Sequence, residues 1–316
     1  MKDFKKLFFK IGGVSLIKHW LKTGMLFYAL RLILVLGFSK KNLEILRLAL
    51  QQKVYKRIKN KYSYVLSKPF IENSSRSIRT DTVWVCWLQG IESAPKLVQE
   101  CFKSLQKNLR DKQIVLITTD NIDDFVHLPY FIKDKWEKGI ITNTHFSDIL
   151  RIELLLKYGG TWIDSTVLCT SQQIPDYIFK SDFFLYQVLK PGSDGHTINL
   201  SSWLMSSKNN NKILLEVREL LYEYWKRENY LEDYFLLHVF IEMVLDKYPS
   251  ERNKIPKFSN SIPHVLLLQF FEEYNQEKYE HIKSLTPFHK LNYKREVSDL
   301  DNKNTFYDFI INQENY

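Results

Sequence analysis

Three charged side chains lie close to one another in the middle of the chain. Asp148 and Arg151 are three residues apart, and Asp164 follows 13 residues later. A carboxylate accepts hydrogen bonds from sugar hydroxyls, and a guanidinium binds two phosphate oxygens at once. This combination of side chains is suited to handling a sugar diphosphate.

The first two of these residues fall within a predicted helix. Residues 143–158 carry a broad apolar face, which predicts a helix whose start Asn143 or Thr144 caps. On a helix, residues three apart project from nearly the same side. We therefore expect Asp148 and Arg151 to face the same space.

The third residue follows a predicted strand. Gly159 stops the helix, because glycine adopts left-handed backbone angles at little cost, and residues 161–163 favour a strand. Asp164 then lies at the carboxyl end of a strand, where open α/β sheets bind ligands. The alternative is that Asp148 and Arg151 form a solvated ion pair and that Gly159 and Gly160 only end a helix.

Strands and helices alternate along the chain in the order that is typical of an α/β sheet. The predicted strands are residues 82–88, 113–118, 161–163, 183–188 and 199–205, and the predicted helices are residues 95–108, 120–125, 129–138, 143–158, 211–227 and 231–247. A glycine- and proline-containing loop is expected at residues 190–196. The predicted organisation is a basic helical segment (residues 1–70), a polar linker (71–81) and one α/β domain (82–316).

The positive charge of the chain is concentrated in its first 70 residues. The whole chain has a net charge of +9, but residues 1–70 hold 16 Lys and Arg against two acidic residues, which gives +14 for them and −5 for the remainder. A nucleic-acid-binding domain would carry its basic residues on the folded domain, so this distribution argues against nucleic acid as a partner. Neither common glycine-rich phosphate loop occurs in the sequence.

The same basic segment contains an apolar stretch, residues 24–38, which only Arg31 interrupts. This stretch is shorter than the roughly 20 residues that span a bilayer, and no signal-peptide cleavage site follows it. The flanking lysines are Lys18, Lys22, Lys40 and Lys41. We expect a basic amphipathic helix on an anionic membrane surface; the alternative is packing on the main domain or on another subunit.

The three cysteines, Cys86, Cys101 and Cys169, are odd in number and have no C-x-x-C spacing. A reducing compartment is the simplest inference, and no zinc site is predicted. Trp84 and Trp162 lie in the middle of apolar strands, so we expect both of them in the core.

Three motifs occur in order: residues 84–90 (WVCWLQG), 147–151 (SDILR) and 158–166 (YGGTWIDST). The chain from about residue 83 to 188 resembles the capsular polysaccharide synthesis glycosyltransferases in these motifs. Those enzymes are related to the family 32 sugar transferases and, more distantly, to the catalytic domains of large clostridial glucosylating toxins. The resemblance implies a GT-A-type, Rossmann-like mixed sheet flanked by helices, a nucleotide-sugar donor and a divalent cation.

The resemblance also implies roles for individual residues. Trp87 matches the aromatic residue that stacks on the donor base, and Asp148 and Arg151 match the pair that contacts the donor sugar. Asp164 matches the first acid of the family's Asp-x-Asp motif, and Thr166 stands in the place of the second acid. The remaining residues assigned to donor binding are Gln89, Ser147 and Trp203.

The expected cofactor is a hard cation, Mn²⁺ or Mg²⁺, which prefers oxygen ligands and acts as a Lewis acid on a diphosphate. The ligands expected for it are Asp164, Thr166 and His238. With one carboxylate missing at Thr166, His238 is the candidate that completes the coordination. The alternative for His238 is a polar residue that is satisfied within its own predicted helix.

The expected function is transfer of a sugar, a hexosyl group from a UDP-sugar, to a saccharide or lipid-linked saccharide acceptor in capsule or exopolysaccharide synthesis. The resemblance implies that the anomeric configuration is retained. The expected location is cytoplasmic, peripheral at the inner face of the cell membrane. The alternative is a non-catalytic nucleotide- or carbohydrate-binding scaffold subunit, which the threonine at position 166 favours. A toxin-like transferase acting on protein is the third reading.

Overall fold

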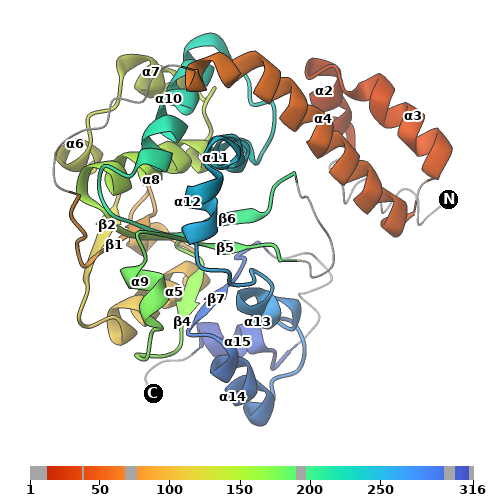
Figure 1. Ribbon diagram of the computed structural model, residues 1–316. Helices are drawn as coiled ribbons and strands as arrows, with labels where there is room; N and C mark the ends of the chain where they lie inside the picture. Colours follow the sequence, from red (N-terminus) through yellow and green to blue (C-terminus); the bar gives the residue numbers. More distant parts are fainter. Residues whose placement is uncertain (1–12, 38, 68–76, 190–196, 295–302, 313–316) are drawn as a thin grey trace.

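The sheet at the centre of the molecule has five strands in the order β2-β1-β3-β6-β5 (Figure 1). The structure is a computed structural model that describes residues 13–37, 39–67, 77–189, 197–294 and 303–312. β1 pairs in parallel with β2 and β3, whereas β6 runs antiparallel to β3 and β5. The strands are β1 (Thr82–Cys86), β2 (Gln113–Ile117), β3 (Gly160–Ile163), β5 (Phe183–Gln187) and β6 (Leu200–Ser207). The predicted mixed α/β sheet is confirmed.

Helices cover both faces of this sheet (Figure 1). The helices over one face are α8 (Asn143–Tyr158), α10 (Lys212–Arg227) and α11 (Leu236–Lys247), and α5 (Lys96–Asn108) lies on the other. Successive side chains of a strand point to opposite faces. Trp84 of β1 accordingly packs in the core beneath α8, whereas Val83 and Val85 pack in the core with α5.

The remaining helices in the described ranges are short, apart from those of the N-terminal segment. They are α6 (Ile122–Phe125), α7 (Tyr130–Glu137), α9 (Asp176–Lys180), α12 (Pro249–Lys254), α13 (Val265–Leu268), α14 (Gln276–Leu285), α15 (Phe306–Ile311) and the 3-10 helices η1 (Ile91–Ser93) and η2 (Ile262–His264). The loop expected at residues 190–196 lies outside the described residues, as do residues 71–76 of the expected linker.

The cap of one helix and the start of another differ from the predicted ones. The cap of α8 is Thr142, whose extended backbone lets its hydroxyl accept a hydrogen bond from the His145 N–H. α11 begins at Leu236 instead of residue 231, because the Asp233 carboxylate accepts the Phe235 N–H at 2.7 Å and holds a turn there.

A pair of glycines brings α8 and β3 close together. Gly159 ends α8 with a φ of 70°, as the sequence predicts, and Gly160 opens β3 with a φ of 94°. A side chain at Gly160 would collide with the carbonyl oxygen of Thr82 on β1. Glycine is therefore required where β3 enters the sheet beside β1.

The N-terminal helices are α2 (Gly13–Lys22), α3 (Leu26–Leu36) and α4 (Lys40–Leu66). The second half of α4 packs on α10 and α11, where Tyr62 is fully buried and donates a hydrogen bond to Glu228 at 2.8 Å. Arg57 forms an ion pair with the buried Glu232. The second half of α4 therefore packs on the main domain.

The other N-terminal helices extend away from the sheet (Figure 1). α2 and α3 pack on the first half of α4 around Ala29, Leu43 and Leu46. Among the helices of the described ranges, none has both the length and the apolar character needed to cross a bilayer.

A second, two-stranded sheet closes one end of the domain. β4 (Val167–Cys169) pairs antiparallel with β7 (Phe288–Lys290), and the register sets Val167 opposite Lys290. The Leu291 N–H also donates to the Thr166 carbonyl at 2.9 Å. A strand near the C-terminus is thereby fixed directly beside the residues that follow β3.

Candidate functional site

A cleft of about 520 Å³ opens at the carboxyl ends of β1 and β3. Its walls come from four parts of the chain: the residues after β1, the first turns of α8, the turn after β3, and β7 with the residues after it. Ligands of open α/β sheets bind at this edge. A volume of this size falls in the range of small-molecule and cofactor sites.

Asp164 is the centre of the hydrogen bonding in this cleft. Its Oδ1 accepts from Arg151 Nη2 at 3.0 Å and from Trp162 Nε1 at 2.9 Å. Its Oδ2 accepts from Lys290 Nζ at 2.9 Å. The Asp164 N–H donates to the carbonyl oxygen of Trp203 at 2.8 Å. The carboxylate is therefore fixed by three side-chain donors and by its own backbone.

Arg151 contacts buried side chains of the protein as well as Asp164 in the cleft. Its guanidinium lies over the Trp162 ring, 4.8 Å from the ring centroid, and its side chain is 4 % exposed. Nη1 lies 3.3 Å from Asp148 Oδ1, and Asp148 Oδ2 lies 3.5 Å from His145 Nδ1. The Asp148–Arg151 pair is thus buried, which excludes a solvated ion pair on the helix surface.

The local charges set the protonation of the groups in the cleft. Burial alone would raise the pKa of Asp164, but Lys290 and Arg151 outweigh this effect and hold that pKa below its ordinary value. Burial raises the pKa of the Cys86 thiol to about 12, although Cys86 also lines the cleft. Asp164 is therefore ionised at neutral pH, whereas Cys86 is a neutral thiol and a poor nucleophile.

The structure brings most of the expected site residues together. Trp87, Gln89, Ser147, Arg151, Asp164 and Thr166 all line the cleft. Asp148 is 8 % exposed and lies behind Arg151, so it touches the guanidinium from the protein side. The rings of Trp87 and Tyr293 are nearly perpendicular, with their centroids 5.6 Å apart, and together give the cleft an aromatic wall.

Trp203 lies in the core instead of the cleft. It is 5 % exposed and stacks on Tyr186 at 4.7 Å, and its Nε1 donates to Asn260 at 2.7 Å. Its contact with the site is the backbone hydrogen bond to Asp164. The structure therefore gives Trp203 a supporting position beneath the site.

His238 lies on α11 and contacts the strand beside it. Its Nε2 accepts the Ser202 N–H at 3.3 Å, so the ring proton of the neutral form is on Nδ1. Nδ1 is buried and has no hydrogen-bond partner among the described residues. Burial lowers the pKa of His238 to about 4, and the ring is neutral at physiological pH.

The residues expected to bind a divalent cation are already occupied by other groups. Both carboxylate oxygens of Asp164 are paired with cationic side chains, and Lys290 Nζ also donates to Thr166 Oγ1 at 2.6 Å. His238 Nε2 is engaged by a backbone N–H. Within the described ranges, no three His, Cys, Asp or Glu side chains are grouped closely enough to hold a metal. In this arrangement the residues do not fit Mn²⁺ or Mg²⁺.

The sequence did not indicate that Lys290 and Tyr293 line the cleft, nor that Trp162 contacts the site. Trp162 is in the core, as predicted, but its indole N–H reaches Asp164. Side chains two apart on a strand point the same way, and this spacing was a usable signal. Lys290 lies 126 residues from Asp164 on a strand of three residues, which leaves no periodic pattern to detect.

A family model described as capsular polysaccharide synthesis protein matches residues 37–310 of this chain. The chain belongs to the capsular polysaccharide synthesis family. The matched range begins just before α4 and ends within α15, so the family unit contains both the cleft and the helix that packs on α10 and α11.

Other comparisons add little to this assignment. Among solved structures, the one described as PaToxG glycosyltransferase is similar, with 14% sequence identity and a TM-score of 0.38, and the match covers 83% of this chain and 96% of that one. A TM-score this low does not define a shared fold. No curated protein matches the chain.

The protonation of His238 in this family member is directly measurable. We predict that nitrogen chemical shifts report a neutral Nδ1–H tautomer and a pKa of about 4. An unfolded histidine has a pKa of about 6.5, so below that pH the unfolded chain takes up a proton that the folded chain does not. The free energy of unfolding therefore falls as the pH is lowered from 6.5 toward 4.

The variant His238→Gln removes the part of this pH dependence of the free energy of unfolding that His238 causes. The control variant His127→Gln, which changes an exposed histidine, keeps that pH dependence. A pKa near 6.5 for His238 in the folded protein would contradict the burial and the tautomer described above.

Proposed function

We propose that this capsular polysaccharide synthesis protein is a glycosyltransferase that moves a hexosyl group from a nucleotide sugar to a saccharide acceptor. The observation that carries the proposal is the pair of cationic side chains, Arg151 and Lys290, that flank Asp164 in a cleft with an aromatic wall. A nucleotide sugar has three parts with different chemistry: a flat base, an anionic diphosphate and a hydroxyl-rich sugar. The cleft offers a partner for each of them.

The position of each side chain in the cleft indicates which part of the donor it would contact. The half-buried Trp87, nearly perpendicular to Tyr293, offers a stacking surface for a uracil base, which makes a UDP-sugar the proposed donor. Arg151 and Lys290 are the groups for the diphosphate. Asp164 and the Ser147 hydroxyl face the same cleft and can bond the hydroxyls of the sugar.

The proposed transfer breaks the bond between the anomeric carbon and the diphosphate oxygen, and the electron pair stays on that oxygen. The acceptor hydroxyl oxygen forms the new bond to the anomeric carbon, and its proton passes to the departing diphosphate oxygen. Asp164 is held in place by three donors, and Cys86 is a neutral thiol. Neither suits a covalent intermediate, so we propose that the retained configuration implied by the family resemblance arises from transfer on one face of the sugar.

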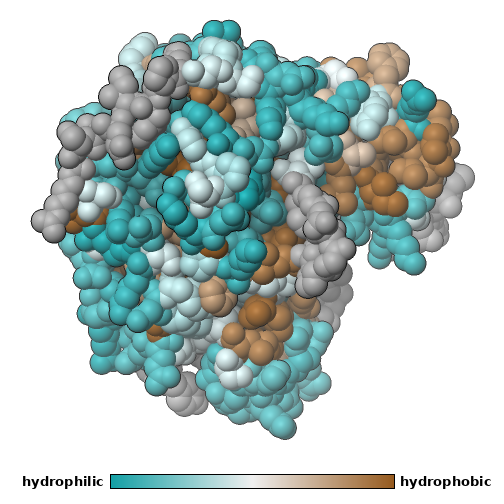
Figure 2. Space-filling model, viewed as in Figure 1, coloured by the Kyte–Doolittle hydropathy of each residue, from teal (hydrophilic) through white to brown (hydrophobic). Residues whose placement is uncertain are grey.

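The acceptor side of the proposal rests on the N-terminal helices. Apolar side chains project from α3 into solvent: Phe27 is 85 %, Leu34 is 86 % and Val35 is 76 % exposed. Figure 2 shows brown surface gathered over this arm of the molecule. Together with the +14 charge of residues 1–70, these side chains fit the headgroup region of an anionic membrane surface. We propose peripheral contact with the cytoplasmic face of the cell membrane.

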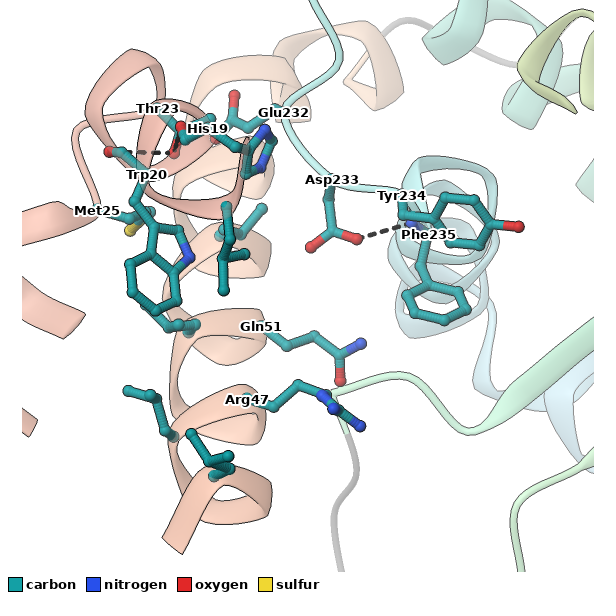
Figure 3. Close-up of a pocket in the computed structure, with 15 residues that line it drawn as sticks. His19, Trp20, Thr23, Met25, Arg47, Gln51, Glu232, Asp233, Tyr234 and Phe235 are labelled. Carbon is teal, nitrogen blue, oxygen red and sulfur yellow. Dashed lines mark hydrogen bonds between the residues drawn. The ribbon is translucent and has the colours of Figure 1, made fainter. Parts of the chain in front are cut away.

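A second pocket, of about 300 Å³, lies between α2, α4 and the segment that precedes α11 (Figure 3). Trp20 of α2 and Leu46 and Leu50 of α4 give it an apolar wall. Tyr234 and Phe235 form the opposite side, as Figure 3 shows. We propose that this pocket takes part of the apolar chain of a lipid-linked saccharide acceptor.

The pocket is connected to the cleft through contacting side chains. The Tyr234 ring lies 5.8 Å from the ring of His145, and His145 pairs with Asp148 behind Arg151. Only a few side chains therefore separate the two pockets, and we propose that a lipid held against Tyr234 presents its saccharide to the cleft. This proximity supports a lipid-linked acceptor.

The donor reaction tests the proposed activity. We predict that Asp164→Ala lowers the kcat of UDP-sugar hydrolysis and of transfer by about 10³-fold, because Arg151 and Lys290 lose the anion that positions them. Asp176→Ala, which removes an exposed aspartate paired with Lys180, is the matched control and keeps wild-type rates. Wild-type turnover by Asp164→Ala would refute the assignment. A protein that binds UDP but turns over no donor would be a scaffold subunit.

Vesicle binding tests the membrane contact. We predict that replacing Phe27, Leu34 and Val35 by serine lowers partitioning onto phosphatidylglycerol-containing vesicles at least tenfold, because each side chain loses apolar burial. Since all three are exposed, circular dichroism and the melting temperature stay near wild type. Tyr130→Ser changes an equally exposed ring on the main domain and is the control. Unchanged binding by the triple variant would rule out α3 as the contact.

Filling the second pocket tests the acceptor site. Excluding two methylene groups of a lipid chain costs about 1.6 kcal/mol, so Leu50→Trp raises the KM for a lipid-linked saccharide roughly 15-fold. The KM for the same saccharide on a short soluble aglycone stays unchanged. Leu48→Trp alters an exposed leucine on the same helix outside the pocket and serves as control. Equal effects of Leu50→Trp on both acceptors would remove the pocket from the proposal.

A further inference from the structure

The ammonium group of Lys290 lies between the two side-chain oxygens that the Asp-x-Thr element offers. Its Nζ is 2.9 Å from Asp164 Oδ2 and 2.6 Å from Thr166 Oγ1. Asp164 and Thr166 are two of the three residues expected to hold a divalent cation, the third being His238. A positive charge that belongs to the protein therefore occupies the place expected for the metal.

The fold itself fixes this placement. Lys290 ends β7, and the pairing of β7 with β4 sets it opposite Val167, one residue after Thr166. The hydrogen bond from the Leu291 N–H to the Thr166 carbonyl, at 2.9 Å, continues the pairing past the end of β7. The Lys290 side chain is 20 % exposed and lines the cleft. Its position thus follows from backbone pairing as well as from its two side-chain contacts.

The Lys290 ammonium also has one N–H donor without a partner in these two contacts. Lysine has three N–H donors, and Asp164 and Thr166 take two of them. Arg151 adds a buried Nε that has no hydrogen-bond partner among the described residues. Lys290 therefore keeps hydrogen-bonding capacity for a ligand anion, whereas the Arg151 Nε is enclosed by the protein.

A divalent cation would have to displace this lysine. It would compete with Lys290 for Asp164 Oδ2, and it would repel the ammonium if both remained. The chain supplies a single carboxylate at this point, since position 166 is threonine. The donor set is poor for a hard cation and well suited to an ammonium.

We propose that Lys290 takes the place of the divalent cation, so that the protein binds the nucleoside diphosphate part of its donor without a metal. The inference rests on the proposed glycosyl transfer. As the bond between the anomeric carbon and the diphosphate oxygen breaks, charge grows on that oxygen, and Lys290 Nζ donates a hydrogen bond to the diphosphate. The lysine keeps its proton throughout and stabilises the leaving group electrostatically.

Calorimetric titration with UDP tests this proposal. Wild-type protein binds UDP in EDTA with a Kd within about threefold of its value in MnCl₂, because the protein supplies the charge. Lys290→Met, which keeps the length of the side chain but removes its charge, weakens UDP binding roughly 10- to 100-fold in EDTA. Lys180→Ala, which removes an exposed lysine paired with Asp176, is the matched control and binds as wild type.

The outcomes separate this proposal from the proposed function. UDP binding that appears only with MnCl₂ would overturn the role of Lys290 and leave a metal-dependent transferase in place. Absence of binding by UDP, ADP, GDP and CDP in both buffers would overturn the transferase itself. If Lys290→Met fails to fold, the wild-type comparison of EDTA with MnCl₂ decides the question alone.

Discussion

The site depends on the carboxylate of Asp164, which is 26 % exposed and held between two cationic side chains. A carboxylate withdrawn from water to this extent is stable only when charged groups and hydrogen-bond donors replace the water. Arg151 and Lys290 supply the charge, and Trp162 supplies a third hydrogen bond. One anion thereby fixes groups from α8, β3 and β7 relative to one another.

Backbone hydrogen bonds and strand pairing place these groups next to one another. The Asp164 N–H is bonded to the neighbouring antiparallel strand β6, and Gly160 lets β3 approach β1 closely. Pairing of β4 with β7 then returns the C-terminal part of the chain to the turn after β3. The same arrangement leaves the cleft open at the carboxyl ends of β1 and β3, where a diphosphate can approach both cations.

Much of this fold was predictable from local patterns. The five apolar strands and the long helices follow from runs and periodicities that burial requires, and the proximity of Asp148, Arg151 and Asp164 follows from helix spacing and a strand end. Trp203 was assigned to donor binding, yet it lies in the core. β6 is buried along almost its whole length, so no polar alternation marked the side on which Trp203 lies.

The position of Lys290 could not be predicted from the sequence for a different reason. β7 has three residues, and its partner β4 also has three, so neither gives a pattern that distinguishes it from a loop. The contact that completes the site spans 126 residues and exists only after the small sheet forms. The ammonium that lies beside Asp164 and Thr166 thus comes from a side chain that no local motif contains.

A structure of the protein bound to UDP in the presence of EDTA tests the central claim most directly. We predict that the diphosphate lies between Arg151 and Lys290, with the Lys290 Nζ within hydrogen-bond distance of a phosphate oxygen and the uracil against Trp87. A diphosphate bound elsewhere, or one seen only with a metal on Asp164 and Lys290 turned away, would contradict it.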